Sequence, residues 1–201
     1  MSLFFKSNNL SLGYGNQLVI SNKNINLELS KNYEIIGKNG SGKTTFLKLL
    51  LKDILPDRGT VKVQKTMEFS YFDQNRSDLK PNDTLKDVMV PNGGDYIEVR
   101  GKMRHVYGYL KEFMFDPKNM LDSVSSLSGG QKNRLKLAKI LANPKSCLIL
   151  DEPTNDLDME TLDMLAEILI AYKGTLILVS HDRDFLDQTV TKILAFDGNG
   201  K

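Results

Sequence analysis

The stretch GKNGSGKT, at residues 37–44, decides the fold of this chain of 201 residues. It matches the pattern G-x-x-x-x-G-K-[ST] and lies between a short apolar segment at 33–36 and a longer one at 46–54. Glycines let successive backbone N–H groups turn inward around phosphate oxygens, and a helix that begins near Lys43 directs its positive dipole at them. The sequence therefore predicts a strand, a phosphate-binding loop and a helix.

The side chains of this loop suit a triphosphate. Lys43 can reach the β- and γ-phosphates, and the hydroxyl of Thr44 can bind Mg²⁺. Both groups come from the last two positions of the pattern, where the predicted helix begins. The phosphate loop is therefore the first part of a predicted nucleotide site.

A second motif ends a fully apolar segment in two carboxylates. The segment at 147–150 is followed by Asp151 and Glu152, and Pro153 ends the predicted strand. Asp151 can orient Mg²⁺ or its water, and Glu152, on the other face of the strand, can reach an attacking water. The alternative is a merely solvated strand end, which the phosphate loop in the same chain makes the weaker interpretation.

A third motif, LSGGQ at residues 127–131, precedes a predicted helix at 130–142. Ser128 can cap this helix, and the two glycines after it leave backbone N–H groups open to an anion. The phosphate loop already provides an anion site in this chain, so the same phosphate needs no second one at this motif. On local physics alone, an ordinary capped helix start explains this motif equally well.

Composition places the chain among ordinary globular α/β proteins. Apolar residues make up 40% and charged residues 26%, which excludes fibrous and disordered chains. The 27 basic and 25 acidic residues leave a net charge of +2, so no strong field attracts nucleic acid or anionic lipid. The apolar stretches are too short to cross a bilayer, and the single cysteine, Cys147, suits a reducing compartment. We expect a cytoplasmic protein without direct membrane insertion.

The order of predicted elements indicates one α/β domain over residues 1–201. Short strands in the first third predict a small antiparallel β layer, and alternating strands and helices predict a mainly parallel sheet with helices on both faces. Residues 75–126 are interpreted as a mostly helical insertion between core segments 1–74 and 127–201. Within it we predict one helix at 84–90 capped by Asp83 and another at 104–115.

Lysines recur at helical spacing after the third motif, at Lys132, Lys136 and Lys139. We interpret this stripe as a solvated helix face, with a contact to ribosomal RNA or DNA as the minority alternative. His105 stands outside every motif and receives no role.

The three motifs, in this order, resemble those of the ATP-binding domain of the ATP-binding cassette (ABC) superfamily. Residues 37–44 are similar to its Walker A motif, 127–131 to its signature motif and 148–152 to its Walker B motif. The resemblance covers essentially the whole chain. It implies a P-loop NTPase fold of ABC type and the hydrolysis of ATP, with Mg²⁺, to ADP and phosphate.

The resemblance also implies a role for single residues. Tyr14 matches the aromatic residue that stacks on adenine, Gln74 the Q-loop residue that senses Mg²⁺ and water, and His181 the switch histidine near the γ-phosphate. The implied catalytic residues are Glu152, His181 and Gln74, and the implied metal ligands are Thr44, Gln74 and Asp151. ATP would be bound by Tyr14, Gly37, Asn39, Gly40, Ser41, Gly42, Lys43, Thr44 and Thr45. The signature residues Ser128, Gly129, Gly130 and Gln131 would contact the ATP of an opposite cassette, and Asp158 would belong to the D-loop.

Within the superfamily, DEPTNDLD at 151–158 and SHDRDFLD at 180–187 resemble the ABC-F subfamily. Its members are soluble, carry two ATPase domains in one polypeptide and act on ribosomes or nucleic acid. The implied partners are thus a second cassette, which we expect in a longer polypeptide, and a ribosome or nucleic acid. Two alternatives remain open. One is the ATPase subunit of a membrane transporter, docked around residues 74–100, and the other is a binding module that ATP gates.

Overall fold

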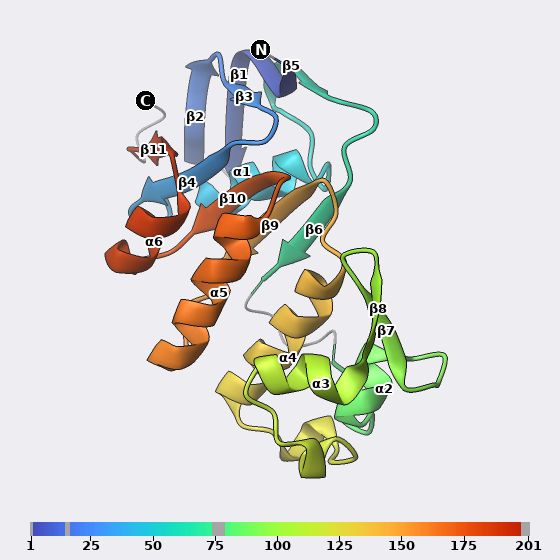
Figure 1. Ribbon diagram of the computed structural model, residues 1–201. Helices are drawn as coiled ribbons and strands as arrows, with labels where there is room; N and C mark the ends of the chain where they lie inside the picture. The colour runs from blue at the N-terminus through green and yellow to red at the C-terminus, as the bar shows by residue number, and fades with distance from the viewer. Residues whose placement is uncertain (1, 15–16, 74–78, 198–201) are drawn as a thin grey trace.

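A parallel sheet forms the centre of the molecule (Figure 1). The computed structural model describes residues 2–14, 17–73 and 79–197. The strand order is β11-β4-β10-β9-β6, and every neighbouring pair is parallel. The carboxyl ends of these strands therefore share one edge of the sheet. The strands are β4 (Asn32–Gly37), β6 (Phe69–Phe72), β9 (Cys147–Asp151), β10 (Thr175–Val179) and β11 (Lys192–Phe196).

An antiparallel sheet covers one side of the molecule, as predicted. Its long strand β1 (Leu3–Tyr14) pairs with β2 (Gln17–Lys23), β3 (Asn26–Glu28) and β5 (Arg58–Val63). Helix α1 (Lys43–Leu50) packs between this sheet and the parallel sheet. The ring of Phe46 in α1 contacts Phe5 of β1 at 5.6 Å and Phe196 of β11 at 5.4 Å between ring centres. This core fixes the helix that follows the phosphate loop.

The strands at the middle of the parallel sheet have apolar side chains on both faces. In β9, Cys147 and Ile149 pack in the core around α1, whereas Leu148 and Leu150 face a second core. The helices that pack on that second core include α4 (Gly129–Ala142), α5 (Met159–Ala171) and α6 (Arg183–Thr189). Burial on both faces explains the continuous apolar run, because successive side chains of a strand point to opposite faces. The predicted helices on both faces are confirmed.

Residues 79–128 contain a β-hairpin that the sequence did not predict. Helix α2 (Leu85–Met89) is followed by strands β7 (Tyr96–Val99) and β8 (Lys102–His105), then α3 (Val106–Glu112) and the 3₁₀ turns Pro117–Asn119 and Val124–Ser126. The helix predicted at 104–115 begins only at Val106. Both hairpin-turn residues, Arg100 and Gly101, have positive φ angles, which favours a tight two-residue turn.

The start of α2 also differs from its prediction. Thr84, not Asp83, caps this helix: its hydroxyl accepts a hydrogen bond from the backbone N–H of Asp87 at 3.1 Å, and Asp87 bonds back to the N–H of Thr84 at 3.0 Å. This reciprocal pair satisfies two N–H groups that a single cap at Asp83 would leave open.

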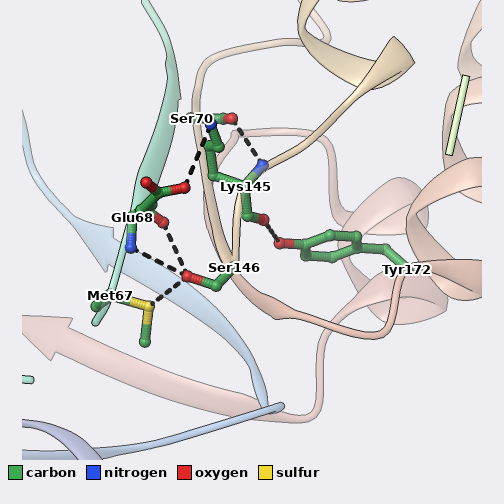
Figure 2. Close-up of polar contacts among 6 residues, drawn as sticks. All are labelled: Met67, Glu68, Ser70, Lys145, Ser146 and Tyr172. Carbon is green, nitrogen blue, oxygen red and sulfur yellow. Dashed lines mark hydrogen bonds and ion pairs between the residues drawn. The ribbon is translucent and has the colours of Figure 1, made fainter. Parts of the chain in front are cut away.

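Polar contacts hold the amino-terminal edge of the parallel sheet together (Figure 2). The hydroxyl of Ser146 accepts a hydrogen bond from the N–H of Glu68 at 3.0 Å, and the N–H of Lys145 donates to the hydroxyl of Ser70 at 3.0 Å. The phenol of Tyr172, at the end of α5, donates to the carbonyl of Lys145. These contacts join the segment before β9 to β6 and to α5, which fixes the register in which β9 crosses the sheet.

No helix in the described part of the chain has both the length and the apolar character needed to cross a membrane.

Candidate nucleotide-binding site

The phosphate loop, residues 37–44, follows β4 at the carboxyl edge of the parallel sheet. Gly42 has a φ of 103°, and a Cβ atom there would lie 2.7 Å from Val19. A Cβ atom on Gly37 would lie 2.6 Å from the carbonyl oxygen of Phe196. Both positions therefore need glycine, one for its backbone conformation and both for close packing.

The loop ends in an open helix start. Gly42 is the N-cap of α1, so no side chain of that residue occupies the N–H groups of the first turn. The ammonium group of Lys43 folds back over the loop and donates to the carbonyl oxygens of Gly37 at 2.6 Å and Lys38 at 3.2 Å. The loop therefore presents a positive charge and a helix amino terminus at one place, which is the arrangement that binds phosphate groups.

A cavity of about 470 Å³ brings the first two motifs together. The phosphate loop and the start of α1 form one wall, and the carboxylates that end β9 form another, because parallel strands end at the same edge. Its predicted site residues are Asn39, Gly40, Gly42, Lys43, Thr44, Thr45, Asp151 and Glu152, and Val19 and Val179 complete the lining. Ser41 of the same loop has a buried hydroxyl without a hydrogen-bond partner among the described residues.

Asp151 is a partly buried carboxylate beside this cavity. Burial raises its pKa, while the hydroxyl of Tyr71, which donates to Oδ2 at 3.4 Å, and the charge of Lys43 act in the opposite direction. A cation near this carboxylate would compensate the cost of burying its charge. The hydroxyl of Thr44 lines the same cavity, so two oxygen donors suited to Mg²⁺ are present.

Glu152 turns towards the cavity on a strained backbone. Its φ is +53°, and its N–H donates to the carbonyl of Val179 at 2.8 Å. Val179 ends β10, the strand next to β9 in the sheet. Oε1 lies 3.2 Å from Nε2 of His181, whereas Oε2 is buried and has no hydrogen-bond partner in the described part of the chain. Burial raises the pKa of Glu152, and the neighbouring His181 opposes the shift. The free oxygen can accept a hydrogen bond from a water molecule.

Two predicted site residues lie wholly or partly beyond what the structure describes. Gln74 lies outside the described residues. Tyr14 is the last residue of β1, and Gly13 before it lines a pocket together with Thr44 and Thr45, but the side chain of Tyr14 lies outside the described part of the structure. Their predicted roles therefore stay predictions.

The signature residues begin α4 and do not line the cavity within the described part of the chain. The hydroxyl of Ser128 accepts a hydrogen bond from the N–H of Gln131 at 3.2 Å, and the Gln131 side chain accepts one from the N–H of Ser128 at 2.8 Å. This reciprocal capping box pairs two N–H groups of the helix start with side chains of the same segment.

The signature helix is fastened to the loop that follows the Walker B acids. A Cβ atom on Gly130 would lie 2.5 Å from the carbonyl oxygen of Asp156. The side chain of Arg134 donates to Asp158 at 3.0 Å, and Asp158 caps α5 by accepting from the N–H of Thr161 at 2.8 Å. The sequence did not predict the contact of Arg134 with Asp158, because no pattern links residues 24 positions apart.

The interpretation of the lysine stripe is wrong at Lys136. This residue is 4% exposed, and its ammonium group lies 2.5 Å from the carboxylate of Asp73. It also lies over the ring of Phe72, 5.4 Å from the ring centre. Lys139, by contrast, is exposed as predicted. A solvated face was expected because the partner, Asp73, is 63 residues away in sequence.

The fold and this cavity define a P-loop nucleotide-binding domain, and the family comparison agrees. The model of the family described as "ABC transporter" matches residues 20–155, so the chain belongs to this family. It is an ATPase domain of ABC type that binds nucleotide, and the predicted fold class and family are confirmed.

Among curated relatives, the chain is similar to proteins of the ABC-F subfamily. It is 48% identical to "ATP-binding protein Uup" of Caulobacter vibrioides over 93% of its length, which is 31% of that protein. It is 40% identical to "Energy-dependent translational throttle protein EttA" of Mycobacterium tuberculosis over 94% of its length, which is 34% of that protein. The chain thus spans about a third of the length of these relatives.

A solved structure shares the fold. The ATP-binding cassette MJ0796, described as dimeric in a post-hydrolysis state with ADP and Pi, superposes with a TM-score of 0.72. The alignment covers 97% of this chain and 95% of the other at 21% sequence identity.

Proposed function

We propose that this domain binds ATP with Mg²⁺ and hydrolyses it to ADP and phosphate. ATP binding would close the domain against a second cassette of the same protein. That protein would be a cytoplasmic member of the ABC-F subfamily that acts on ribosomes or nucleic acid. The observation that carries the proposal is the cavity of about 470 Å³, where the phosphate loop faces the two acids at the end of β9.

Binding of the triphosphate follows from the open start of α1. The N–H groups of the first turn and the loop would surround the phosphates, and Lys43 would exchange its contacts with two loop carbonyls for the more negative phosphate oxygens. Tyr14 would stack on the adenine ring at the end of β1. Asn39, Thr45 and the glycines would complete the cradle.

Mg²⁺ would be held by the hydroxyl of Thr44 and the carboxylate of Asp151, with Gln74 as the third protein ligand. When bound, the ion neutralises charge on the β- and γ-phosphates. The partly buried carboxylate of Asp151, whose pKa is raised by burial, supports such a role because a bound cation would offset its desolvation.

Glu152 would orient and deprotonate the attacking water. Its buried Oε2 atom has no partner among the described residues, so it can accept a hydrogen bond from that water, while Oε1 faces His181. A raised pKa makes this carboxylate a better proton acceptor than an exposed glutamate. His181, whose side chain is 71% exposed, can turn from Glu152 towards the γ-phosphate.

The signature motif would complete a site on the other cassette. Ser128 to Gln131 are absent from the described lining of this chain's own cavity, and the capping box prepares the start of α4 as a rigid unit. A head-to-tail pair would place this unit over the other cassette's ATP, with Asp158 at the interface. The dimeric MJ0796 cassette with ADP and Pi supports a pair of this kind.

The proposed target rests on the curated relatives. EttA, which is 40% identical to this chain, is named for an action on translation, and this favours the ribosome over DNA. A net charge of +2 gives this domain little long-range attraction for RNA. We therefore place the recognition of the ribosome in other segments of the polypeptide.

Glu152→Gln tests the hydrolytic assignment. The amide has nearly the same shape but does not accept the water's proton, so ATP binding should persist while turnover falls about 10² to 10⁴-fold. Calorimetry measures the binding and phosphate release measures the turnover. Unchanged turnover would contradict the role of Glu152.

The same variant tests the composite site. With ATP and Mg²⁺, Glu152→Gln should shift the 201-residue chain towards a weak homodimer that light scattering detects. Adding Ser128→Arg places bulk and charge at the interface, and it should abolish the dimer while ATP binding to the monomer remains. A dimer that forms without ATP, or that ignores Ser128→Arg, would contradict the mechanism.

A further inference from the structure

Lys136 stands out because it is charged and buried. Within residues 2–14, 17–73 and 79–197, no other charged residue is buried. It lies on α4, two helical turns after Gly129 at the signature end, and faces β6. In Figure 1, β6 ends beside α4. Burial of a lysine needs a compensating partner, since the desolvation cost of an ammonium ion is several kcal/mol.

One partner of Lys136 is Asp73, the residue that directly follows β6. The ammonium group of Lys136 lies 2.5 Å from Oδ1 of Asp73 and 3.1 Å from the carbonyl oxygen of the same residue. It therefore binds residue 73 through both side chain and main chain. The ring of Phe72, one residue earlier, lies under the same cation at 5.4 Å. These contacts fix the position and the peptide orientation of the chain at the end of β6.

The end of β6 lies between two parts of the proposed ATPase site. Tyr71, two residues before Asp73, donates its hydroxyl to Asp151 at 3.4 Å. The residue after Asp73 is Gln74, which we propose as the ligand of Mg²⁺ and sensor of the water. Helix α4 carries the signature motif at its amino-terminal end. Two turns later, the same helix contacts the end of β6, which leads to the proposed metal ligands.

Stability alone is a weak explanation for this ion pair. A buried ion pair is commonly replaced by well-packed apolar side chains without loss of stability, because desolvation offsets the attraction between the charges. Leu135, Leu137, Ala138 and Leu141 of α4 are apolar and buried, so a methionine at 136 would suit its surroundings. What methionine cannot do is bind a carboxylate and a carbonyl oxygen of one residue.

We propose that Lys136 is a positioning residue for ATP hydrolysis, which holds the end of β6, and through Tyr71 the carboxylate of Asp151, in a fixed relation to the signature helix. This inference rests on the proposed function. Lys136 does not line the nucleotide cavity within the described part of the chain. It acts through Asp73, and it supports the step that follows ATP binding.

The test compares Lys136→Met with Lys136→Arg and with the control Lys139→Met, which removes an exposed lysine of the same helix. Lys136→Met should lower kcat about tenfold or more, because small displacements of catalytic groups cost up to ~10²-fold, with ATP affinity within about twofold of wild type. Lys136→Arg, which keeps the charge and two donors, should restore most of kcat. Lys139→Met should change neither value.

Asp73→Asn supplies an independent check, because it weakens the same contact from the other side. The double variant with Lys136→Met should lose no more kcat than the worse single variant. An unchanged kcat in Lys136→Met, a loss of kcat that Lys136→Arg does not repair, or a loss of ATP affinity as large as the loss of kcat would overturn the proposal. Glu152→Gln, measured beside these variants, separates the positioning role of Lys136 from the proposed ATPase function. If Glu152→Gln stops turnover and Lys136→Met does not, only the role of Lys136 is contradicted.

Discussion

Two glycine-rich helix starts in this chain differ in whether side chains pair with their backbone N–H groups. At α1 the N-cap is Gly42, so the first turn stays open towards a cavity of about 470 Å³. At α4 the side chains of Ser128 and Gln131 cap the helix reciprocally, so the N–H groups of these two residues are already paired, and we call this start closed. The open start is ready for a ligand within its own chain. The closed start of α4 presents a preformed surface, which fits the proposed contact with the ATP of another cassette.

The largest expected effect is at the open start. Lys43→Ala removes the only cation that lines the cavity among the described residues, and ATP affinity should fall by about tenfold to a hundredfold, since charge-assisted hydrogen bonds contribute about 1.5–3 kcal/mol. Turnover should be abolished, whereas the melting temperature without nucleotide should hardly change. Calorimetry provides the measurement, and near-normal affinity would refute the assignment of the phosphate loop.

At the closed start, the expected effect is on packing. In Gly130→Ala the new methyl group would lie 2.5 Å from the carbonyl oxygen of Asp156, so the loop must move. We expect a loss of about 1–3 kcal/mol in the free energy of unfolding. Gly108→Ala is the matched control, because a Cβ atom on that helical glycine meets nothing within 4 Å. The control should gain about 0.5–1 kcal/mol from helix propensity, and equal effects at both sites would contradict the close approach.

A smaller change sharpens the same comparison. Ser128→Ala removes one half of the capping box, which should cost about 0.5–2 kcal/mol of stability. ATP affinity of the single domain should stay unchanged, because Ser128 does not line its described cavity. Denaturant unfolding and calorimetry on the same samples measure both quantities. A loss of ATP affinity here would mean that α4 contributes to the domain's own site.

The smallest expected effect concerns the pH dependence of stability without nucleotide. Burial raises the pKa of Glu152 in the folded state, so the folded state binds this proton more tightly and the ionised group destabilises it near pH 7. Glu152→Gln should therefore be slightly more stable than wild type near pH 7. The difference should shrink as the pH falls through the raised pKa of Glu152.

Denaturant unfolding at several pH values measures this difference. Repeating it in a His181→Ala background controls for the opposing charge of His181, which lies 3.2 Å from Glu152. A wild-type protein that is more stable than Glu152→Gln near pH 7 in both backgrounds would contradict the cost of burying this carboxylate.

Local patterns predicted the parts of the fold that depend on near neighbours in sequence. The strand before Gly37, the helix from Lys43 and the helix at 130–142 were all predicted, because each rests on a short motif or a periodicity. The hairpin at 96–105 was missed, since each of its strands is only four residues long.

By itself, the sequence determined the two candidate helix starts, the acids at the end of β9 and the family of the protein. These features reside in contiguous residues, whose chemistry is set by spacing along the chain. Only the tertiary structure decided that Lys136 is buried against Asp73, that Arg134 reaches Asp158 and that Oε2 of Glu152 is left without a partner among the described residues. Each of these features depends on which segments the sheet brings together. Burial and pairing are set by distances in space between residues that lie far apart in the sequence, and no local pattern shows those distances.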